Sequence, residues 1–105
     1  MNQSFTIHNY DIIITLSNNY VIIKVFDTKN NIKMYQNKFD IILLKDLFQN
    51  KFETIQDFYN VIIAGLSDDK YVETYIYEYN NNIYIYTIYS YIIQFEFTIE
   101  LYAKQ

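Results

Sequence analysis

The sequence predicts an α+β fold in which an antiparallel sheet curls into a β-sandwich or a half-open barrel. The sheet is expected to consist of two three-strand meanders with a helical insertion between them. Two observations support this class. Apolar and polar residues alternate toward both ends of the chain, whereas apolar residues in the middle recur every three or four positions. A single helical stretch separates the two runs of strands, so a parallel sheet with repeated helical crossovers is not expected.

The first meander is expected to begin near Tyr10, after residues 4–8, which form either a short strand or an ordered lead-in. Ile12, Ile14 and Leu16 share one face of its first strand. The second strand is apolar on both faces, which is typical of a central strand covered on both sides. The expected strands cover residues 10–16, 20–26 and 32–36, with turns at 17–19 and 27–31 that contain asparagine, a residue that tolerates a positive φ.

The middle of the chain predicts two helices. The apolar spacing over residues 40–48 suits one face of a short helix. Thr54 and Asp57 resemble a capping box at the start of a second, longer helix. The apolar stripe of this helix consists of Ile55, Phe58, Ile62, Ile63 and Leu66. Gly65 and residues 67–69 are expected to end it, since glycine best tolerates a left-handed C-cap.

The second meander occupies the end of the chain. Its first two strands are expected to join through a two-residue turn at Asn80 and Asn81. The expected cross-strand pairs are Tyr77 with Tyr84 and Tyr75 with Tyr86. In the last strand, the residues of one face are Ile93, Phe95, Phe97, Ile99 and Leu101, and those of the other are Gln94, Glu96, Thr98 and Glu100. This alternation predicts a sheet with one dry face and one wet face.

Length and composition indicate one domain over residues 1–105, because a hydrophobic content of 51% is enough for one core. No apolar run reaches the roughly eighteen residues of a membrane span, and the N-terminus has no signal-peptide pattern. We therefore expect no membrane partner and an intracellular protein, cytoplasmic or cytoskeletal. The chain contains no cysteine, which excludes disulfides and thiolate metal sites.

The charge balance argues against nucleic acid as a partner. The formal net charge is −4 and the chain has no arginine, whereas nucleic-acid-binding domains usually carry a basic stripe. Lysines do gather around one loop, at Lys24, Lys29, Lys33 and Lys38. They form either a solvated, protected strand edge or a phosphate site, and the solvated edge is the favoured interpretation.

No pattern of residues supports catalysis. Ser4, His8 and Asp11 lie along one extended segment, where they cannot converge as a catalytic triad. Glu96 and Glu100 lie on the polar face of the last strand, and a carboxyl group there lacks the burial that a general acid requires. We therefore expect a protein that is not an enzyme and that has no cofactor and no metal ion.

Tyrosine distinguishes the second meander, since eight of the thirteen tyrosines lie between residues 71 and 91. The tyrosines expected to form a cross-strand ladder are Tyr71, Tyr75, Tyr77 and Tyr79 with Tyr84 and Tyr86. In solvent, such a ladder offers the large, rigid surface that interfaces favour. The alternative is that they only stabilise the sheet. The lack of proline and arginine and the scarcity of glycine and alanine indicate an AT-rich gene, which itself raises the tyrosine count.

The order of meander, helix and long final hairpin resembles the globular heads of the centriolar cartwheel protein and of the DNA end-joining scaffold factors. The matching stretches are IKMYQNKFDIILLKDLF at 32–48, FETIQDFYNVIIAGL at 52–66 and IYIYTIYSYIIQFEFTIEL at 83–101. In cartwheel heads, a bulky apolar residue near the corner of the last hairpin inserts into a pocket on a second head. A gap-free correspondence places Tyr91 there, beside Ser90. Those heads continue into a coiled coil, and no heptads occur here before Gln105. We therefore expect either an isolated head of a longer protein or a likeness of architecture alone.

The resemblance implies a non-enzymatic interaction or self-assembly head that forms homo-oligomers through its last hairpin. The partner-binding residues are then Tyr91 and Tyr89, supported by Tyr75, Tyr77, Tyr84 and Tyr86. The alternative is a β-barrel that carries a small ligand or a peptide. A carrier of this kind requires a continuous apolar cavity where the first meander faces the last.

Overall fold

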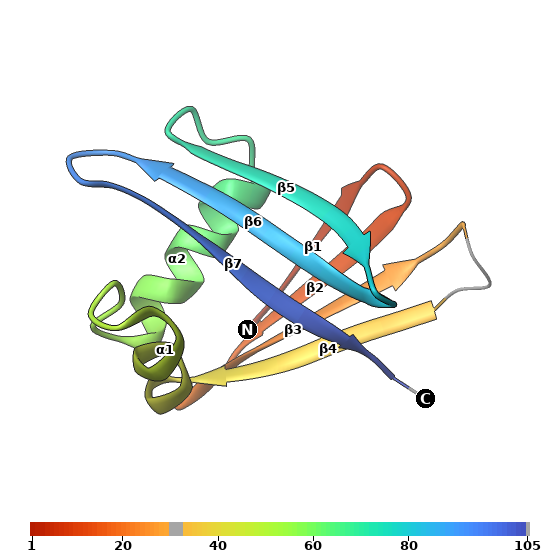
Figure 1. Cartoon of the computed structure of the whole chain (residues 1–105), viewed down its shortest axis with the longest axis horizontal. Coiled ribbons are helices and arrows are strands. Elements are labelled where there is room, and N and C mark those ends of the chain that lie inside the picture. The colour runs from red at the N-terminus through yellow and green to blue at the C-terminus, as the bar shows by residue number, and fades with distance from the viewer. Residues whose placement is uncertain (30–32, 105) are drawn as a thin grey trace.

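The computed structural model describes residues 1–29 and 33–104. In this part of the chain the secondary structure comprises β1 (Asn2–Ile7), β2 (Tyr10–Leu16), β3 (Tyr20–Asp27), β4 (Lys33–Asp40), α1 (Ile41–Phe48), α2 (Ile55–Leu66), β5 (Val72–Tyr79), β6 (Asn82–Ser90) and β7 (Gln94–Ala103) (Figure 1). Residues 30–32 carry part of the predicted second turn and the first residue of the predicted third strand. They lie outside the described residues.

The strands form one antiparallel sheet in the order β1-β2-β3-β4-β7-β6-β5. β1 to β4 make one meander and β5 to β7 a second. The two meanders meet where β4 pairs with β7, through Tyr35 with Ala103 and Gln36 with Tyr102. The sheet curls into a half-barrel, and α1 and α2 lie at one end of it (Figure 1). The predicted α+β class is therefore confirmed in its half-open-barrel form, with the helices between the meanders.

The first meander has four strands rather than the predicted three, because residues 2–7 form a full strand against β2. The lead-in alternative for this segment is thereby wrong. A tight turn at His8 and Asn9 joins the two strands, and His8 adopts a positive φ of 55° there. The predicted turn at 17–19 is also present, with the Ser17 amide donating to the Tyr20 carbonyl at 2.9 Å. Its asparagines are not among the described residues with a positive φ.

The prediction that the second strand is covered on both sides holds for one face only. Val21, Ile23 and Val25 of β3 are fully buried against the core. Ile22 and Lys24, on the opposite face, are partly exposed. The apolar residues of the outer face therefore do not indicate a second layer over this strand.

The core fills the concave side of the half-barrel. Its aromatic centre is a cluster of Phe39 from β4, Phe58 from α2 and Phe52 from the segment between the helices. The Phe39 and Phe58 ring centroids lie 5.3 Å apart, and those of Phe52 and Phe58 lie 5.2 Å apart. Around it pack Ile12, Ile14, Val21, Ile23, Val25, Ile83, Ile85, Ile99 and Leu101. The even residues of β2 and the odd residues of β6 and β7 thus face inward, as their alternation predicts.

The predicted capping box at the start of α2 is confirmed. The Asp57 amide donates to Thr54 Oγ1 and the Thr54 amide donates to Asp57 Oδ2, both at 3.1 Å. Asp40 caps α1 by accepting from the Leu43 amide at 2.8 Å. Each cap satisfies backbone amides that have no partner within the first turn of a helix.

The predicted role of Gly65 as a left-handed C-cap is wrong. Gly65 lies inside α2, and the positive φ after the helix belongs to Asp68, at 63°. Glycine serves another purpose here, because a Cβ at this position would clash with Thr74 Oγ1 and lie 3.2 Å from Val72 Cγ1 on β5. The absent side chain lets α2 approach the sheet closely.

The predicted hairpin between β5 and β6 is confirmed in detail. Asn80 and Asn81 have φ values of 51° and 66°, the left-handed conformation that a two-residue turn requires at both positions. The register that follows pairs Tyr77 with Tyr84 and Tyr75 with Tyr86.

Candidate interaction surfaces

The corner of the last hairpin, residues 89–93, exposes a group of apolar side chains. Ile92 is fully exposed, Ile93 is 69% exposed and Tyr91 is 44% exposed. These residues connect β6 to β7. Isolated apolar residues are common on protein surfaces, but three in succession at a protruding turn form a patch that indicates contact with another surface.

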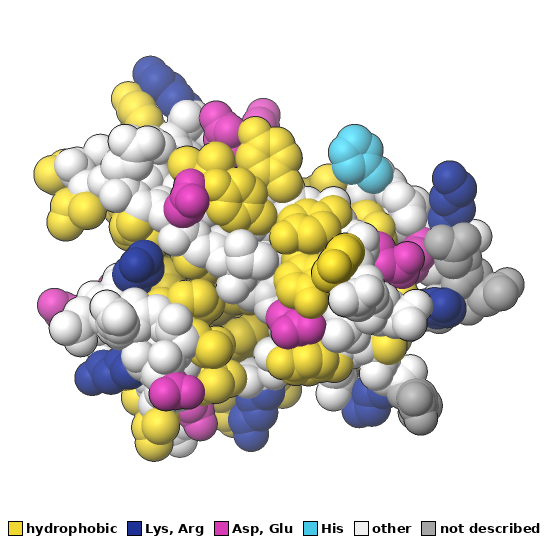
Figure 2. Space-filling model, in the orientation of Figure 1, with side chains coloured by type: hydrophobic (Ala, Val, Ile, Leu, Met, Phe, Trp, Pro, Cys, Tyr) yellow, Lys and Arg dark blue, Asp and Glu magenta, His cyan; other side chains and the backbone are white. Residues whose placement is uncertain are grey.

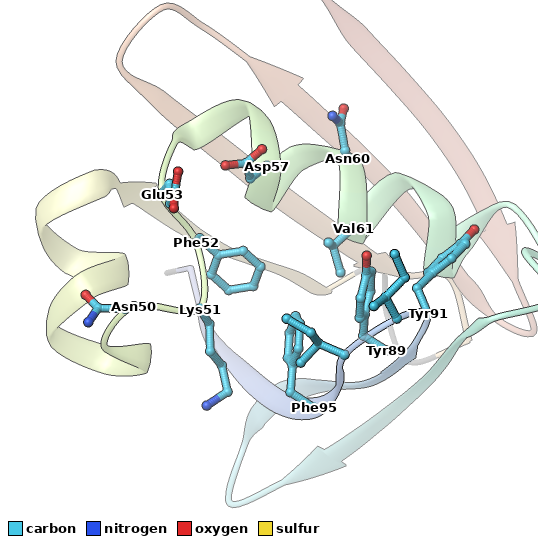
Figure 3. A pocket seen from close by; sticks show the side chains of 12 residues that line it. Asn50, Lys51, Phe52, Glu53, Asp57, Asn60, Val61, Tyr89, Tyr91 and Phe95 are labelled. Atoms are coloured by element: carbon cyan, nitrogen blue, oxygen red, sulfur yellow. The ribbon is translucent and has the colours of Figure 1, made fainter.

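A pocket of about 760 Å³ lies directly beside this corner. It is bounded by the hairpin corner, by the segment between α1 and α2 and by α2 (Figure 3). The rings of Phe52 and Phe95 meet in it, with centroids 6.0 Å apart, and Val61 of α2 contributes an aliphatic wall. Its polar residues are Asn50, Lys51, Glu53, Asp57 and Asn60. Aromatic and aliphatic walls with a few polar groups are typical of a site that receives an apolar side chain.

The pocket continues the inner face of the sheet beyond the core. Tyr89 and Phe95 lie in the inward-facing rows of β6 and β7, and their rings stack with centroids 4.7 Å apart. Both side chains are only partly buried, whereas Phe97, the next residue of the row, is buried. The inward-facing apolar row therefore continues beyond the buried core and becomes partly exposed to solvent at the corner.

Tyr91 is held against the segment that precedes β5. Its hydroxyl donates to Asp69 Oδ2 at 2.6 Å, and its ring packs on Tyr71 and Tyr89 with centroids 4.9 and 5.1 Å apart. The Asp69 side chain also accepts from the Tyr71 amide at 2.7 Å. The Asp69 carboxylate raises the pKa of Tyr91 to about 12, and the same hydrogen bond lowers the pKa of Asp69. These contacts orient the corner, and they leave Ile92 as its freely protruding side chain.

A second surface, the outer tyrosine face, is the convex side of β5, β6 and β7. It consists of Glu73, Tyr75, Tyr77, Tyr79, Asn82, Tyr84, Tyr86, Ile88, Glu96, Thr98 and Glu100. Tyr77 stacks on Tyr84 at 5.4 Å with an interplanar angle of 14°, and Tyr75 stacks on Tyr86 at 6.1 Å. The predicted ladder is thus present, with the β5 tyrosines exposed and those of β6 partly exposed.

Carboxylates hold the tyrosine hydroxyls of this face. Tyr84 donates to Glu100 and Tyr75 to Glu73, both at 2.8 Å, while Tyr86 donates to Glu96 at 2.6 Å. In each case the hydrogen bond to the carboxylate is the largest cause of a raised tyrosine pKa. The phenols therefore stay protonated and the glutamates supply the charge of the surface.

The residues weighed for catalysis do not converge. Asp11 accepts from Thr6 Oγ1 at 3.0 Å, Ser4 pairs with Ile13 in the ladder of β1 and β2, and His8 lies exposed in the turn between these strands. Among residues 1–29 and 33–104, no group of three or more His, Cys, Asp or Glu side chains is placed to hold a metal ion. Within the same ranges, no helix has the length and hydropathy needed to cross a membrane.

The space between the meanders, where a carrier needs its cavity, is occupied by core side chains. Fully buried residues from both meanders meet there, among them Ile23 and Ile99. The pocket beside the corner is at one end of the sheet and opens to solvent between separate elements (Figure 3). The structure thus gives the carrier hypothesis no specific support.

The fold of this chain has been seen before. No protein-family model matches the sequence, and no curated protein matches it. Among solved structures, the head domain of human CCDC61 superposes with a TM-score of 0.78, covering 99% of this chain and 95% of that one at 14% sequence identity. The chain has a head-domain fold. The resemblance predicted from the sequence is thereby confirmed for the architecture.

The predicted partner-binding corner is exposed, and its most exposed residue is not the predicted Tyr91. The gap-free correspondence selected Tyr91, whereas the side chain that protrudes without an intramolecular hydrogen bond or ring contact is that of Ile92. The only available signal was the composition of the turn itself, in which Ile92 and Ile93 are consecutive and break the alternation of the strand. The pocket gave no sequence signal, because its walls come from three separate segments.

Proposed function

We propose that this chain is a non-enzymatic interaction head that associates with a second copy of itself through the hairpin corner. The observation that carries the proposal is the exposed apolar corner, whose residues themselves form one edge of an apolar-walled pocket of about 760 Å³. The head-domain fold supports it, as does the resemblance of the last hairpin to that of cartwheel heads. The expected cytoplasmic or cytoskeletal location stays a prediction.

The arrangement of the two parts favours a reciprocal contact. A surface that carries both a protruding group and its receptor is self-complementary, so two copies related by a twofold axis satisfy both at once. In such a dimer, Ile92 of each copy enters the pocket of the other and contacts Phe52, Val61 and Phe95. Burial of one isoleucine side chain contributes about 1.5–3 kcal/mol, so two insertions support a weak, concentration-dependent dimer.

Tyr91 and Tyr89 keep a role in this proposal, beside the inserting residue. Tyr91 braces the turn through Asp69, and Tyr89 flanks the pocket with Phe95. An ordered turn loses less conformational freedom on binding than a mobile one. We therefore assign insertion to Ile92 and support of the corner to the two tyrosines.

Sedimentation velocity from micromolar to millimolar concentration tests the proposal. The wild-type chain is expected to shift from monomer to dimer over this range, whereas Ile92→Glu is expected to stay monomeric because a carboxylate does not enter the apolar pocket. Val61→Glu changes the pocket wall and should have the same effect. Tyr91→Glu should weaken association less than Ile92→Glu.

Ile42→Glu is the matched control, since Ile42 is another exposed isoleucine (77%) that lies on α1 and does not line this pocket. It should dimerise like the wild type. A wild-type chain that stays monomeric to millimolar concentration would contradict self-association. Equal loss in Ile42→Glu and Ile92→Glu would contradict the assignment to the corner.

A further inference from the structure

The outer tyrosine face differs from the rest of the surface in its charge. The strands β5, β6 and β7 contain four glutamates and no lysine, arginine or histidine. All eight lysines of the chain lie in other segments, and Figure 2 shows the dark blue side chains around the edge of the view that looks onto these strands. The face is thus both aromatic and acidic, and the three strands that form it contribute no basic residue.

Each glutamate of this face uses only one oxygen within the molecule. Tyr75, Tyr86 and Tyr84 donate to the Oε2 atoms of Glu73, Glu96 and Glu100 respectively, and Asn82 also donates to Glu100 Oε2 at 2.9 Å. Among the described residues, no cation lies within ion-pair distance of these three carboxylates, and their Oε1 atoms accept no hydrogen bond. The tyrosine hydroxyls fix the carboxylates in place and leave one oxygen of each available.

The arrangement of the face selects an elongated occupant. Glu100 lies in one row with Tyr84 and Tyr77, whereas Glu96 lies four residues away along β7, in the row of Glu73. Four residues of a strand span about 13 Å. The row between these two holds the stacked Tyr75 and Tyr86, so an aromatic row separates the acidic positions, and Ile88 lies between Glu96 and Glu73. An extended segment with basic residues four positions apart matches this spacing.

The chemistry of the face favours arginine over lysine as the basic residue. A guanidinium stacks on an aromatic ring and donates two parallel hydrogen bonds to a carboxylate, whereas an ammonium is a strongly hydrated point charge. The exposed rings of Tyr75 and Tyr77 beside oriented carboxylates offer both contacts. This chain contains no arginine, so a second copy cannot supply the guanidinium.

We propose that the outer tyrosine face binds an extended, arginine-bearing segment of a different protein, with arginines about four residues apart at Glu100 and at Glu96 with Glu73. The surface is separate from the hairpin corner, and the proposal does not depend on self-association. Binding of this kind weakens as salt concentration rises, because the ion pairs are exposed.

Titration of the ¹⁵N-labelled chain with a short synthetic peptide that carries arginine at every fourth position tests the proposal. We expect the amide signals of β5, β6 and β7 to shift, with those of β1 and β2 unchanged. The double variant Glu96→Gln/Glu100→Gln keeps acceptors for the tyrosine hydroxyls and removes two charges. Its affinity should fall by about tenfold, which corresponds to about 1.4 kcal/mol. Tyr77→Ser should weaken binding without changing net charge.

The matched control is Asp46→Asn/Asp68→Asn, which removes two charges on other parts of the surface, where Asp46 is exposed on α1 and Asp68 follows α2. It should bind the peptide like the wild type, and a peptide with lysine in place of arginine should bind more weakly. Equal loss in both double variants, or shifts spread over the lysine-bearing strands, would overturn the proposal. Circular dichroism of each variant establishes that the fold is retained.

Discussion

The inner and outer faces of β6 and β7 share one backbone and differ in what their side chains do. On the inner face, Ile83, Ile85 and Leu101 are fully buried in the core. On the outer face, Tyr84 and Tyr86 stay partly exposed and hydrogen-bond to carboxylates. In these two strands, the inward-facing residues alone provide the apolar burial that stabilises the fold. The abundance of tyrosine in these strands is therefore not a requirement of the core, and the outer set is free to serve binding.

The largest difference between the faces should appear in one substitution made at two positions. Ile85→Ala removes a fully buried side chain and is expected to lower the free energy of unfolding by about 2–5 kcal/mol. Ile92→Ala makes the same chemical change at a fully exposed site and should alter it by less than about 0.5 kcal/mol. Urea denaturation followed by circular dichroism measures both. Similar losses for the two variants would show that the corner is part of the stabilising core.

A smaller effect is expected where the helix meets the inner face. Gly65→Ala places a methyl group against Thr74 Oγ1, and we expect a loss of about 1–3 kcal/mol from overpacking. This outweighs the gain of about 1 kcal/mol that alanine brings to a helix interior. Thermal and urea denaturation of the single variant measure the balance.

Thr74→Ala provides the matching rescue. The Thr74 hydroxyl is buried without a hydrogen-bond partner, so its removal alone should cost little. The double variant Gly65→Ala/Thr74→Ala should then be more stable than Gly65→Ala. A Gly65→Ala chain at least as stable as the wild type would show that α2 has room to move away from the sheet.

The smallest effect concerns two tyrosine–carboxylate pairs, one buried and one exposed. Burial and the hydrogen bond to Glu78 raise the pKa of Tyr35 to about 12, and the hydrogen bond to Asp69 raises that of Tyr91 to about 12. An unfolded tyrosine ionises near pH 10. The folded chain therefore binds these protons more tightly, and its stability is complete below about pH 10 and falls as the pH rises from 10 toward 12.

Denaturation midpoints at pH 8.5 and pH 11 for wild type, Tyr35→Phe and Tyr91→Phe separate the two pairs. Tyr35→Phe should remove more of the alkaline loss than Tyr91→Phe, because Tyr35 is fully buried whereas the pair at the corner is screened by water. The opposite ranking would mean that the pair at the hairpin corner, rather than the buried pair of Tyr35 and Glu78, limits stability at high pH.

Local signals in the sequence were enough to predict most of the fold. The capping box at Thr54 and Asp57 and the two-residue turn at Asn80 and Asn81 depend on neighbouring residues only, so they could be recognised before the structure. Strand alternation fixed which residues of β7 face inward. Each of these features acts within a few positions of the chain.

Features that depend on distant residues could not be obtained in this way. The role of Gly65 follows from its contact with Thr74 on another element, and the pocket beside the corner brings Phe52, Val61 and Phe95 together from three segments. The exposure of Ile92 depends on which side chains the turn leaves uncovered. A pattern of residues does not give such distances, so the exposure of Ile92 could not be predicted from the sequence.

The short pairing of β4 with β7 is the junction that connects the two meanders. Each meander is built from hairpins whose strands are close in sequence, whereas this junction joins Tyr35 to Ala103 and lets Asn37 donate to the Glu100 carbonyl at 2.9 Å. Bringing residues so distant in the sequence together costs conformational entropy, and the few hydrogen bonds of this junction offset little of that cost. We therefore expect the two meanders to form first and separately, and the half-barrel to become one body only when this junction closes.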